Sequence, residues 1–362
     1  MRSPAAVWSP RAWPAEPLWA EPSKVARVRI LLLSNMYPSP ERPDYGVFVA
    51  DLAEALRERG HEIDEAVLSA GRGGLARYGL LAERALREAR HRPDVIYAHY
   101  LVPTGLVAWA ASRASGAPYV ITAHGRDVRN AYSHASLGRL TRFVLRGSAA
   151  VIAVSEYLAG QLPPGATVVE SIDCGVDTER FSPDGWQPGD EPRFLFVGAL
   201  TKRKNAGRLL EAFAQVGQGT LTVVGDGPLS GPLQAAAPAG VRFAGRLDRA
   251  GVTAAMHQAD VMVVPSLVEP QGQVVLEALA SGLPVVATRV GGPAEVITDE
   301  CGALVDPLDV DSIADGMRRA LELPAPCPAA VEAAAAHDRR RQAERIERVL
   351  ERAVSGGARP PG

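Results

Sequence analysis

The sequence predicts an α/β protein built from two doubly wound parallel-sheet domains in tandem, each Rossmann-like, that face one another across a cleft. Three observations lead to this prediction. Short and almost wholly apolar segments recur along the chain, which is typical of strands buried on both faces. Helical patterns separate most of these segments, and this alternation indicates a parallel sheet covered on both sides. A stretch rich in Pro, Gly and Asp, residues 182–192, divides the series and is predicted to be a linker.

The first domain is predicted to cover residues 25–181. It follows an N-terminal extension, residues 1–24, in which tryptophans and prolines alternate without the apolar centre of a signal peptide. We expect this extension to be a disordered tail, the alternative being that its tryptophans contact a membrane surface or a partner. The first helix is predicted over 46–59. The predicted strands are 28–34, 62–68, 94–98, 118–122, 150–154 and 167–172.

The second domain is predicted to cover residues 193–323. Its strands are predicted over 194–197, 220–224, 241–244, 260–264, 284–287 and 302–305, and its helices over 205–216, 248–258, 272–281 and 309–323. Ligands of doubly wound sheets bind beyond the carboxyl ends of the strands, so the default site is the interdomain cleft, which a hinge would close. Residues 324–362 are predicted to be a Pro/Ala linker, a helix over 337–354 and a tail. That helix is expected either to cross back to the first domain or to lie basic side down on a membrane.

Composition excludes several classes of protein. Hydrophobic residues make up 47% and charged residues 22%, values that are ordinary for a globular protein. The net charge of -2 argues against a nucleic-acid partner, which requires an excess of basic residues. The three cysteines lie far apart, which favours neither disulfides nor a zinc site and indicates a cytoplasmic protein. The longest uncharged run, residues 95–112, is interrupted by His99 and Pro103 and is interpreted as strand, loop and helix rather than a membrane span.

The most informative segment is residues 261–293. Its predicted helix is apolar all round except for Glu277, and no cation lies three or four positions away. A buried carboxylate needs a partner, so Glu277 is expected to meet either a distant arginine or a ligand such as a ribose diol. Glu269 and the amides around Gly272 lie at the start of this helix, where phosphate is favoured. The alternative is a structural Glu277–Arg pair with a solvated Glu269.

Five motifs in a fixed order resemble those of glycosyltransferase family 4, whose members have the GT-B fold. The resemblance covers about residues 28–320, and the stretches at 34–62 and 98–111 are most similar to the branch with teichuronic-acid and exopolysaccharide transferases. The motifs are Ala-His-Gly-Arg-Asp at 123–127, Val-Ser-Glu at 154–156, Gly-Val-Asp at 175–177 with Arg-Phe at 180–181, Val-Gly-Ala-Leu at 197–200 with Lys204, and Glu269-x7-Glu277 with Gly-Gly-Pro-Ala-Glu at 291–295.

The resemblance implies roles on the donor side. Glu277 would hold the nucleotide ribose, and Glu269 would contact the transferred sugar. Lys204 would neutralise the diphosphate as it leaves. Main-chain groups would contact the sugar hydroxyls at Gln271 and Gly272 and the diphosphate at Gln273 and Val274.

On the side of the first domain, the resemblance implies that His124 approaches the sugar near its reacting carbon. Gly46, which ends the long loop 35–45, would let the backbone come close to the donor phosphate. The sequence departs from the family at the phosphate-binding arginine, which is Ala199 here, and Arg203 is expected to replace its charge. Two further departures are Gln271 in place of a phenylalanine and Tyr45-Gly46 in place of paired glycines.

The activity implied is that of a retaining, hexosyltransferase-type glycosyltransferase. It would move a sugar from a nucleotide-diphosphate donor on the second domain to a hydroxyl of a glycan or lipid-linked glycan on the first, in cell-surface polysaccharide biosynthesis. No metal or other cofactor is expected, because Asp309-Val310-Asp311 is interpreted as a helix cap rather than a metal motif. The alternatives are a sugar-nucleotide 2-epimerase and a non-catalytic nucleotide-sugar-binding partner. The expected location is the cytoplasm, with a peripheral contact to the inner face of the membrane as an option.

Overall fold

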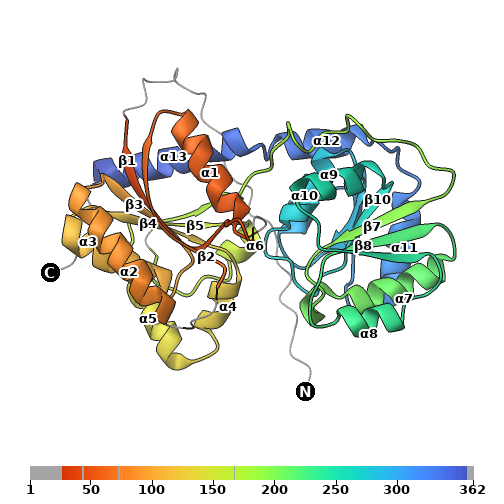
Figure 1. The fold of residues 1–362 in the computed structure, drawn as a ribbon, viewed down its shortest axis with the longest axis horizontal. Coiled ribbons are helices and arrows are strands. Elements are labelled where there is room, and N and C mark those ends of the chain that lie inside the picture. Colours follow the sequence, from red (N-terminus) through yellow and green to blue (C-terminus); the bar gives the residue numbers. More distant parts are fainter. Residues whose placement is uncertain (1–26, 43–44, 72–73, 75, 167, 357–362) are drawn as a thin grey trace.

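The structure, a computed structural model, describes residues 27–42, 45–71, 74, 76–166 and 168–356; the predicted extension 1–24 lies outside them. These residues form two six-stranded sheets in which every pair of neighbouring strands is parallel (Figure 1). The first sheet comprises β1 (Arg29–Tyr37), β2 (Glu62–Ser69), β3 (Val95–His99), β4 (Tyr119–Ala123), β5 (Ala150–Ala153) and β6 (Val169–Ser171). The second comprises β7 (Arg193–Val197), β8 (Thr220–Val224), β9 (Val241–Gly245), β10 (Val261–Val264), β11 (Val285–Thr288) and β12 (Gly302–Val305).

The strand order confirms the predicted doubly wound fold. It is β2-β1-β3-β4-β5-β6 in the first sheet and β12-β11-β10-β7-β8-β9 in the second. The order in which strands are added across the sheet changes sense between β1 and β3 and between β7 and β10. Ligands of doubly wound sheets bind at such switch points, beyond the carboxyl ends of the strands. All twelve predicted strands are present. The strand β1 continues three residues beyond its predicted end, so the loop before Gly46 is shorter than expected.

Helices cover both faces of the first sheet. One face packs on α2 (Ala76–Glu88), α3 (Thr104–Ser115) and α5 (Ala135–Gly147), and the other on α1 (Val47–Glu58) and the C-terminal α13 (Arg339–Gly356). The last helix therefore crosses back to the first domain, the first of the two alternatives considered for it (Figure 1). Short helices α4 (Arg126–Ala131) and α6 (Glu156–Ala159) and the 3-10 turn η1 (Ala89–His91) complete this domain.

The second sheet is also covered on both faces. One core contains α9 (Arg249–His257), α10 (Gln273–Ala280) and α12 (Pro328–Ala335), and the other contains α7 (Ala206–Val216), α8 (Ser230–Ala235) and α11 (Val310–Ala320). The 3-10 turns η2 (Lys202–Lys204) and η3 (Gly292–Glu295) follow β7 and β11. The stretch expected to be a Pro/Ala linker thus contains α12, whose Ala330 and Ala334 are fully buried. No helix of the described residues combines the length and apolarity that crossing a membrane requires.

Candidate active site

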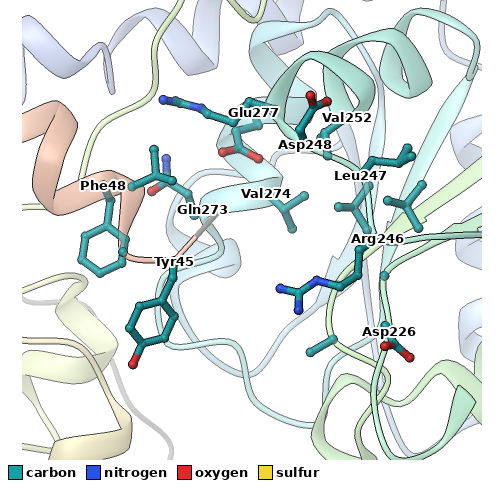
Figure 2. Close-up of a pocket in the computed structure, with 18 of the residues that line it drawn as sticks. Tyr45, Phe48, Asp226, Arg246, Leu247, Asp248, Val252, Gln273, Val274 and Glu277 are labelled. Atoms are coloured by element: carbon teal, nitrogen blue, oxygen red, sulfur yellow. The ribbon is translucent and has the colours of Figure 1, made fainter. Parts of the chain in front are cut away.

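A cavity of about 620 Å³ lies between the two domains, at the carboxyl ends of both sheets (Figure 2). The loops after β1, β7, β8, β9 and β10 line it, which places it at the switch point of each sheet. Six of the predicted site residues line it: Gly46, Lys204, Glu269, Gln273, Val274 and Glu277. Gly272 and Arg203 adjoin lining residues along the chain, Gln271 lies two positions from each of the lining residues Glu269 and Gln273, and His124 contacts the lining residue Phe48.

Glu277 points into this cavity from α10 (Figure 2). Burial raises the pKa of its carboxyl to about 7, an effect that the nearby Arg249 opposes and Asp51 slightly strengthens. Arg249 makes its ion pair with Asp51 of α1, at 2.8 Å, and no hydrogen bond or ion pair reaches the Glu277 carboxylate from the described residues. The structural Glu277–Arg pair considered as an alternative is therefore not formed. A partly buried acceptor that lines a cavity and has no partner in the part of the chain that the structure describes is suited to a ligand that donates hydrogen bonds.

Glu269, by contrast, has protein partners, all of them at one carboxylate oxygen. Its Oε2 atom accepts from Lys204 Nζ at 2.6 Å and from Ser266 Oγ at 2.9 Å, and Arg203 lies 3.6 Å away. Burial alone would raise the pKa of the Glu269 carboxyl, but Lys204 and Arg203 hold it below its usual value. Glu269 is therefore buried rather than solvated, with 7% of its surface exposed. An ammonium has three donors, so Lys204 keeps two for another acceptor in the cavity.

The start of α10 presents main-chain donors to the cavity. Gly272 precedes the helix with a φ of 87°, in the left-handed region that glycine adopts without strain. The amides of Gln273 and Val274, both at the cavity wall, belong to the first turn and have no acceptor within the helix. The Gln273 side chain donates to the carbonyl of Gly175 at 2.7 Å, which joins α10 to the segment between the two sheets.

His124 directly follows the carboxyl end of β4, in the middle of the first sheet, and is not among the residues that line the cavity. Its Nε2 is 3.0 Å from Nδ1 of His99, and its ring packs on Phe48 and Tyr100 at centroid distances of 5.0 and 4.6 Å. Burial, followed by the neighbouring His99, lowers the pKa of His124 well below its usual value, and burial lowers the pKa of His99 to about 3. Both imidazoles are therefore neutral near pH 7. Asp127 holds the His124 main chain by accepting from its amide at 3.1 Å.

Several cavity residues were not anticipated. Arg246 and Arg249 follow β9, and Figure 2 shows Arg246 extending from there toward Tyr45 of the other domain. Arg203, expected to replace the missing family arginine, instead donates to the Val268 carbonyl at 3.0 Å and is not among the residues that line the cavity. The sequence signal that could have identified Arg246 and Arg249 is their position just after the predicted strand 241–244, because loops at the carboxyl ends of strands face the ligand.

Glycosyltransferase Family 4 is the family description that matches residues 46–180, and Glycosyl transferases group 1 matches residues 191–323. The two matches fall on the two sheets in the order that the motifs predicted. The chain belongs to glycosyltransferase family 4. The predicted family is confirmed, and each sheet with its helices is one half of the GT-B fold.

Curated relatives carry glycosyltransferase names. The chain is 30% identical over 256 residues to the protein named teichuronic acid biosynthesis glycosyltransferase TuaC of Bacillus subtilis, covering 66% of this chain. It is 32% identical over 249 residues to the GDP-mannose-dependent alpha-mannosyltransferase of Mycobacterium tuberculosis, covering 64% of this chain. The alignment spans 65% of the length of each of these two relatives.

Solved structures share the fold along most of the chain. The sucrose-phosphate synthase of Thermosynechococcus elongatus superposes with a TM-score of 0.76 at 23% identity, covering 91% of this chain and all of that one. Anabaena HepE, solved in complex with UDP-glucose, superposes with a TM-score of 0.72 at 20% identity, again covering 91% of this chain and all of that one. These likenesses establish the fold.

Proposed function

We propose that the chain is a retaining glycosyltransferase that moves a sugar from a nucleotide-diphosphate donor to a hydroxyl of a glycan or lipid-linked glycan in cell-surface polysaccharide biosynthesis. The observation that carries the proposal is the unpaired Glu277 carboxylate in a cavity that also presents Lys204 and the first amides of α10. Together they offer an acceptor for a ribose diol and donors for a diphosphate. The names of the relatives support a nucleotide-sugar donor and a polysaccharide product.

The proposed chemistry requires no nucleophile from the protein. The leaving phosphate would take the proton of the acceptor hydroxyl on the face from which it departs, which retains the configuration of the sugar carbon. Lys204 and the amides of Gln273 and Val274 would stabilise the charge that grows on the phosphate. His124, neutral and held by His99, would contact the sugar from the first domain. Glu269 would position Lys204 and contact the sugar hydroxyls.

Titration with UDP, GDP and ADP tests the donor site. Glu277→Ala is expected to weaken binding of the preferred nucleotide tenfold or more, because it removes two charge-assisted hydrogen bonds worth about 1.5–3 kcal/mol each. Glu322→Ala, an exposed carboxylate of the same domain outside the cavity, is the matched control and should bind as the wild type does. Equal affinity in the Glu277→Ala variant would remove the ribose assignment.

Activity measurements separate the proposal from its rivals. A transferase releases the nucleoside diphosphate only with an acceptor, whereas an epimerase interconverts sugar nucleotides without one, and a binding partner does neither. Turnover should survive EDTA, since the charges proposed to face the phosphate are Lys204 and main-chain amides. Among the described residues, the group of metal-ligand types formed by Asp64, Glu88 and His91 lies away from the cavity. Loss of activity on chelation and its recovery with magnesium would contradict this charge assignment.

A further inference from the structure

The first domain carries an unusually basic surface on two of its helices. The helices α3 and α5 contain Arg113, Arg139, Arg142 and Arg146, and neither helix contains an aspartate or glutamate. The whole chain is slightly acidic, with a net charge of -2. Within these two helices, positive charge is therefore not balanced by acidic residues.

These four arginines are not neutralised by the protein. None of the four makes a side-chain hydrogen bond or an ion pair with the described residues, and three of them, Arg113, Arg139 and Arg146, are exposed. The arginines of α13 are different, because Arg348 and Arg352 pair with Glu344 and Glu170. Unpaired cations on a face without acidic residues create a positive potential that attracts an anionic partner.

Large apolar side chains are interleaved with these cations. Trp109 of α3 is 37% exposed, and Leu140 and Phe143 of α5 are 39% and 46% exposed. The Trp109 and Phe143 rings make an edge contact at 5.2 Å, which joins the two helices into one surface. Along α5, residues 139, 143 and 146 lie on one side of the helix by their spacing of four and three. We call Trp109, Arg113, Arg139, Leu140, Phe143 and Arg146 the α3/α5 face.

The α3/α5 face lies away from both the donor cavity and α13. It belongs to the helices on one side of the first sheet, whereas α1 and α13 cover the other side (Figure 1). The basic side of α13, considered as a membrane contact, instead reaches the first domain: Arg345 donates to the Ser171 carbonyl at 2.7 Å, and Arg352 pairs with Glu170 at 2.6 Å. Among the described helices, α3 and α5 thus offer basic and aromatic residues that are not already engaged.

We infer that the α3/α5 face docks the protein on a bilayer surface that contains anionic lipid. Tryptophan, phenylalanine and leucine are suited to the boundary between headgroups and acyl chains, and arginines nearby are attracted by lipid phosphates. Exposed aromatic side chains among unpaired cations match both parts of such a surface. The inference rests on the proposed function in one respect: an acceptor linked to lipid would be presented to the domain that bears this face.

The test is flotation of the purified full-length protein with lipid vesicles. We expect binding to phosphatidylcholine vesicles that contain about one third phosphatidylglycerol, no binding to pure phosphatidylcholine, and weakening by salt. Replacement of Arg113, Arg139 and Arg146 by glutamine should weaken binding about a hundredfold, because each arginine near an anionic surface contributes roughly fivefold. Leu140→Ser with Phe143→Ser should also weaken it. The matched control replaces Arg242, Arg319 and Arg341, which are exposed and make no ion pair with the described residues, by glutamine.

Three results would overturn the inference. The wild type could fail to bind anionic vesicles, the control triple could lose as much affinity as the α3/α5 triple, or heparin could bind more tightly than the vesicles, which would assign the face to an acidic polymer. Nucleotide titration of the same variants keeps the proposals apart. A triple variant that loses vesicle binding while keeping nucleotide affinity supports the inference, and failure of nucleotide binding in the wild type would overturn only the proposed donor site.

Discussion

One carboxylate in this cavity lowers the stability of the folded protein when it is ionised. Glu277 is a partly buried carboxylate that the described residues do not pair, and its raised pKa of about 7 expresses that cost. Glu269, only eight positions earlier, has the opposite shift because Lys204 and Arg203 face it. The pKa values of Glu269 and Glu277 are thus shifted in opposite directions. The difference arises because cations face Glu269, whereas no group of the described residues pairs with Glu277.

The first prediction concerns stability and pH. The folded-state pKa of Glu277 lies above its unfolded value, so the folded protein holds the proton more tightly and loses this advantage as the pH rises from about 5 to about 8. Glu277→Gln, which cannot ionise, should therefore be more stable than the wild type at about pH 8, by on the order of 2 kcal/mol, and equally stable near pH 5. Thermal unfolding without nucleotide across this range measures it; a stability difference independent of pH would contradict the assignment.

The second prediction concerns the pair of Lys204 and Glu269. Lys204→Met should lower kcat by about 2–4 kcal/mol of transition-state stabilisation, because the phosphate loses a charge that acts as its bond breaks. It should also destabilise the fold, since Glu269 keeps a buried charge without its closest partner. The double variant Lys204→Met with Glu269→Gln should regain stability but not kcat. Recovery of both, or of neither, would show that the two residues do not have separate roles.

At the scale of elements, the C-terminal helix is held by one buried carboxylate. Glu347 of α13 accepts from His61 at 2.6 Å and pairs with Arg59, and the side chains of Glu347 and His61 are 3% and 1% exposed. The amide of Val28 donates to His61 Nδ1 at 3.3 Å, so the proton on this ring is at Nε2 and is donated to Glu347. This cluster joins α13 to the start of β2.

The third prediction follows from this cluster. Glu347→Ala should destabilise the protein by roughly 2–4 kcal/mol, because it leaves Arg59 and His61 without their buried acceptor. Glu344→Ala on the same helix is the matched control: its pair with Arg348 is half-exposed, and its loss should change stability by less than about 1 kcal/mol. Urea unfolding of both variants measures the difference. Similar values for the two would mean that apolar packing alone attaches α13.

The sequence predicted the helices and strands better than it predicted the contacts between side chains that are distant in sequence. Buried strands such as β3, β4 and β10 are apolar except for His99 and Thr122, and this pattern depends on the sheet alone. The helix α12 was missed because its Pro/Ala-rich sequence has the composition of a linker, and only its packing on α10 shows its place. The motifs predicted Glu277 and Lys204 in the cavity, but the Asp51–Arg249 pair joins residues 198 positions apart, and nothing local in the sequence indicates that these two residues meet.

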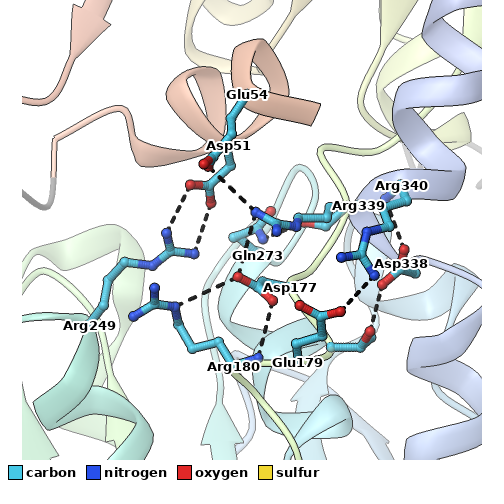
Figure 3. A network of polar contacts seen from close by, with 12 residues as sticks. Asp51, Glu54, Asp177, Glu179, Arg180, Arg249, Gln273, Asp338, Arg339 and Arg340 are labelled. Carbon is cyan, nitrogen blue, oxygen red and sulfur yellow. Dashed lines mark hydrogen bonds and ion pairs between the residues drawn. The ribbon is translucent and has the colours of Figure 1, made fainter. Parts of the chain in front are cut away.

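At the scale of the whole molecule, an ion pair joins the two domains beside the cavity, next to pairs that attach α13 to the first domain. Asp51 of α1 meets Arg249 of α9, and Arg339 of α13 lies 3.8 Å from Glu54 and 3.7 Å from Asp177 (Figure 3). On the other side of the site, Glu295 accepts from the amides of Glu156 and Tyr157 at 2.9 and 2.7 Å, at the start of α6. Contacts on both sides of the cavity hold the two domains together.

The last prediction is that the Asp51–Arg249 pair favours the closed cleft in the absence of donor. The two side chains are 21% and 27% exposed, so water screens the pair only in part, and its loss should shift the balance between open and closed forms by about 1 kcal/mol. Asp51→Ala should therefore increase the radius of gyration of the ligand-free protein in small-angle X-ray scattering. Saturating nucleotide should reduce the increase, because a ligand bridging both domains replaces the lost pair. Glu58→Ala, which removes an exposed carboxylate from the same helix, should scatter as the wild type does. If Asp51→Ala also scatters as the wild type does, the contacts of Glu295 with the start of α6 are sufficient to keep the cleft closed.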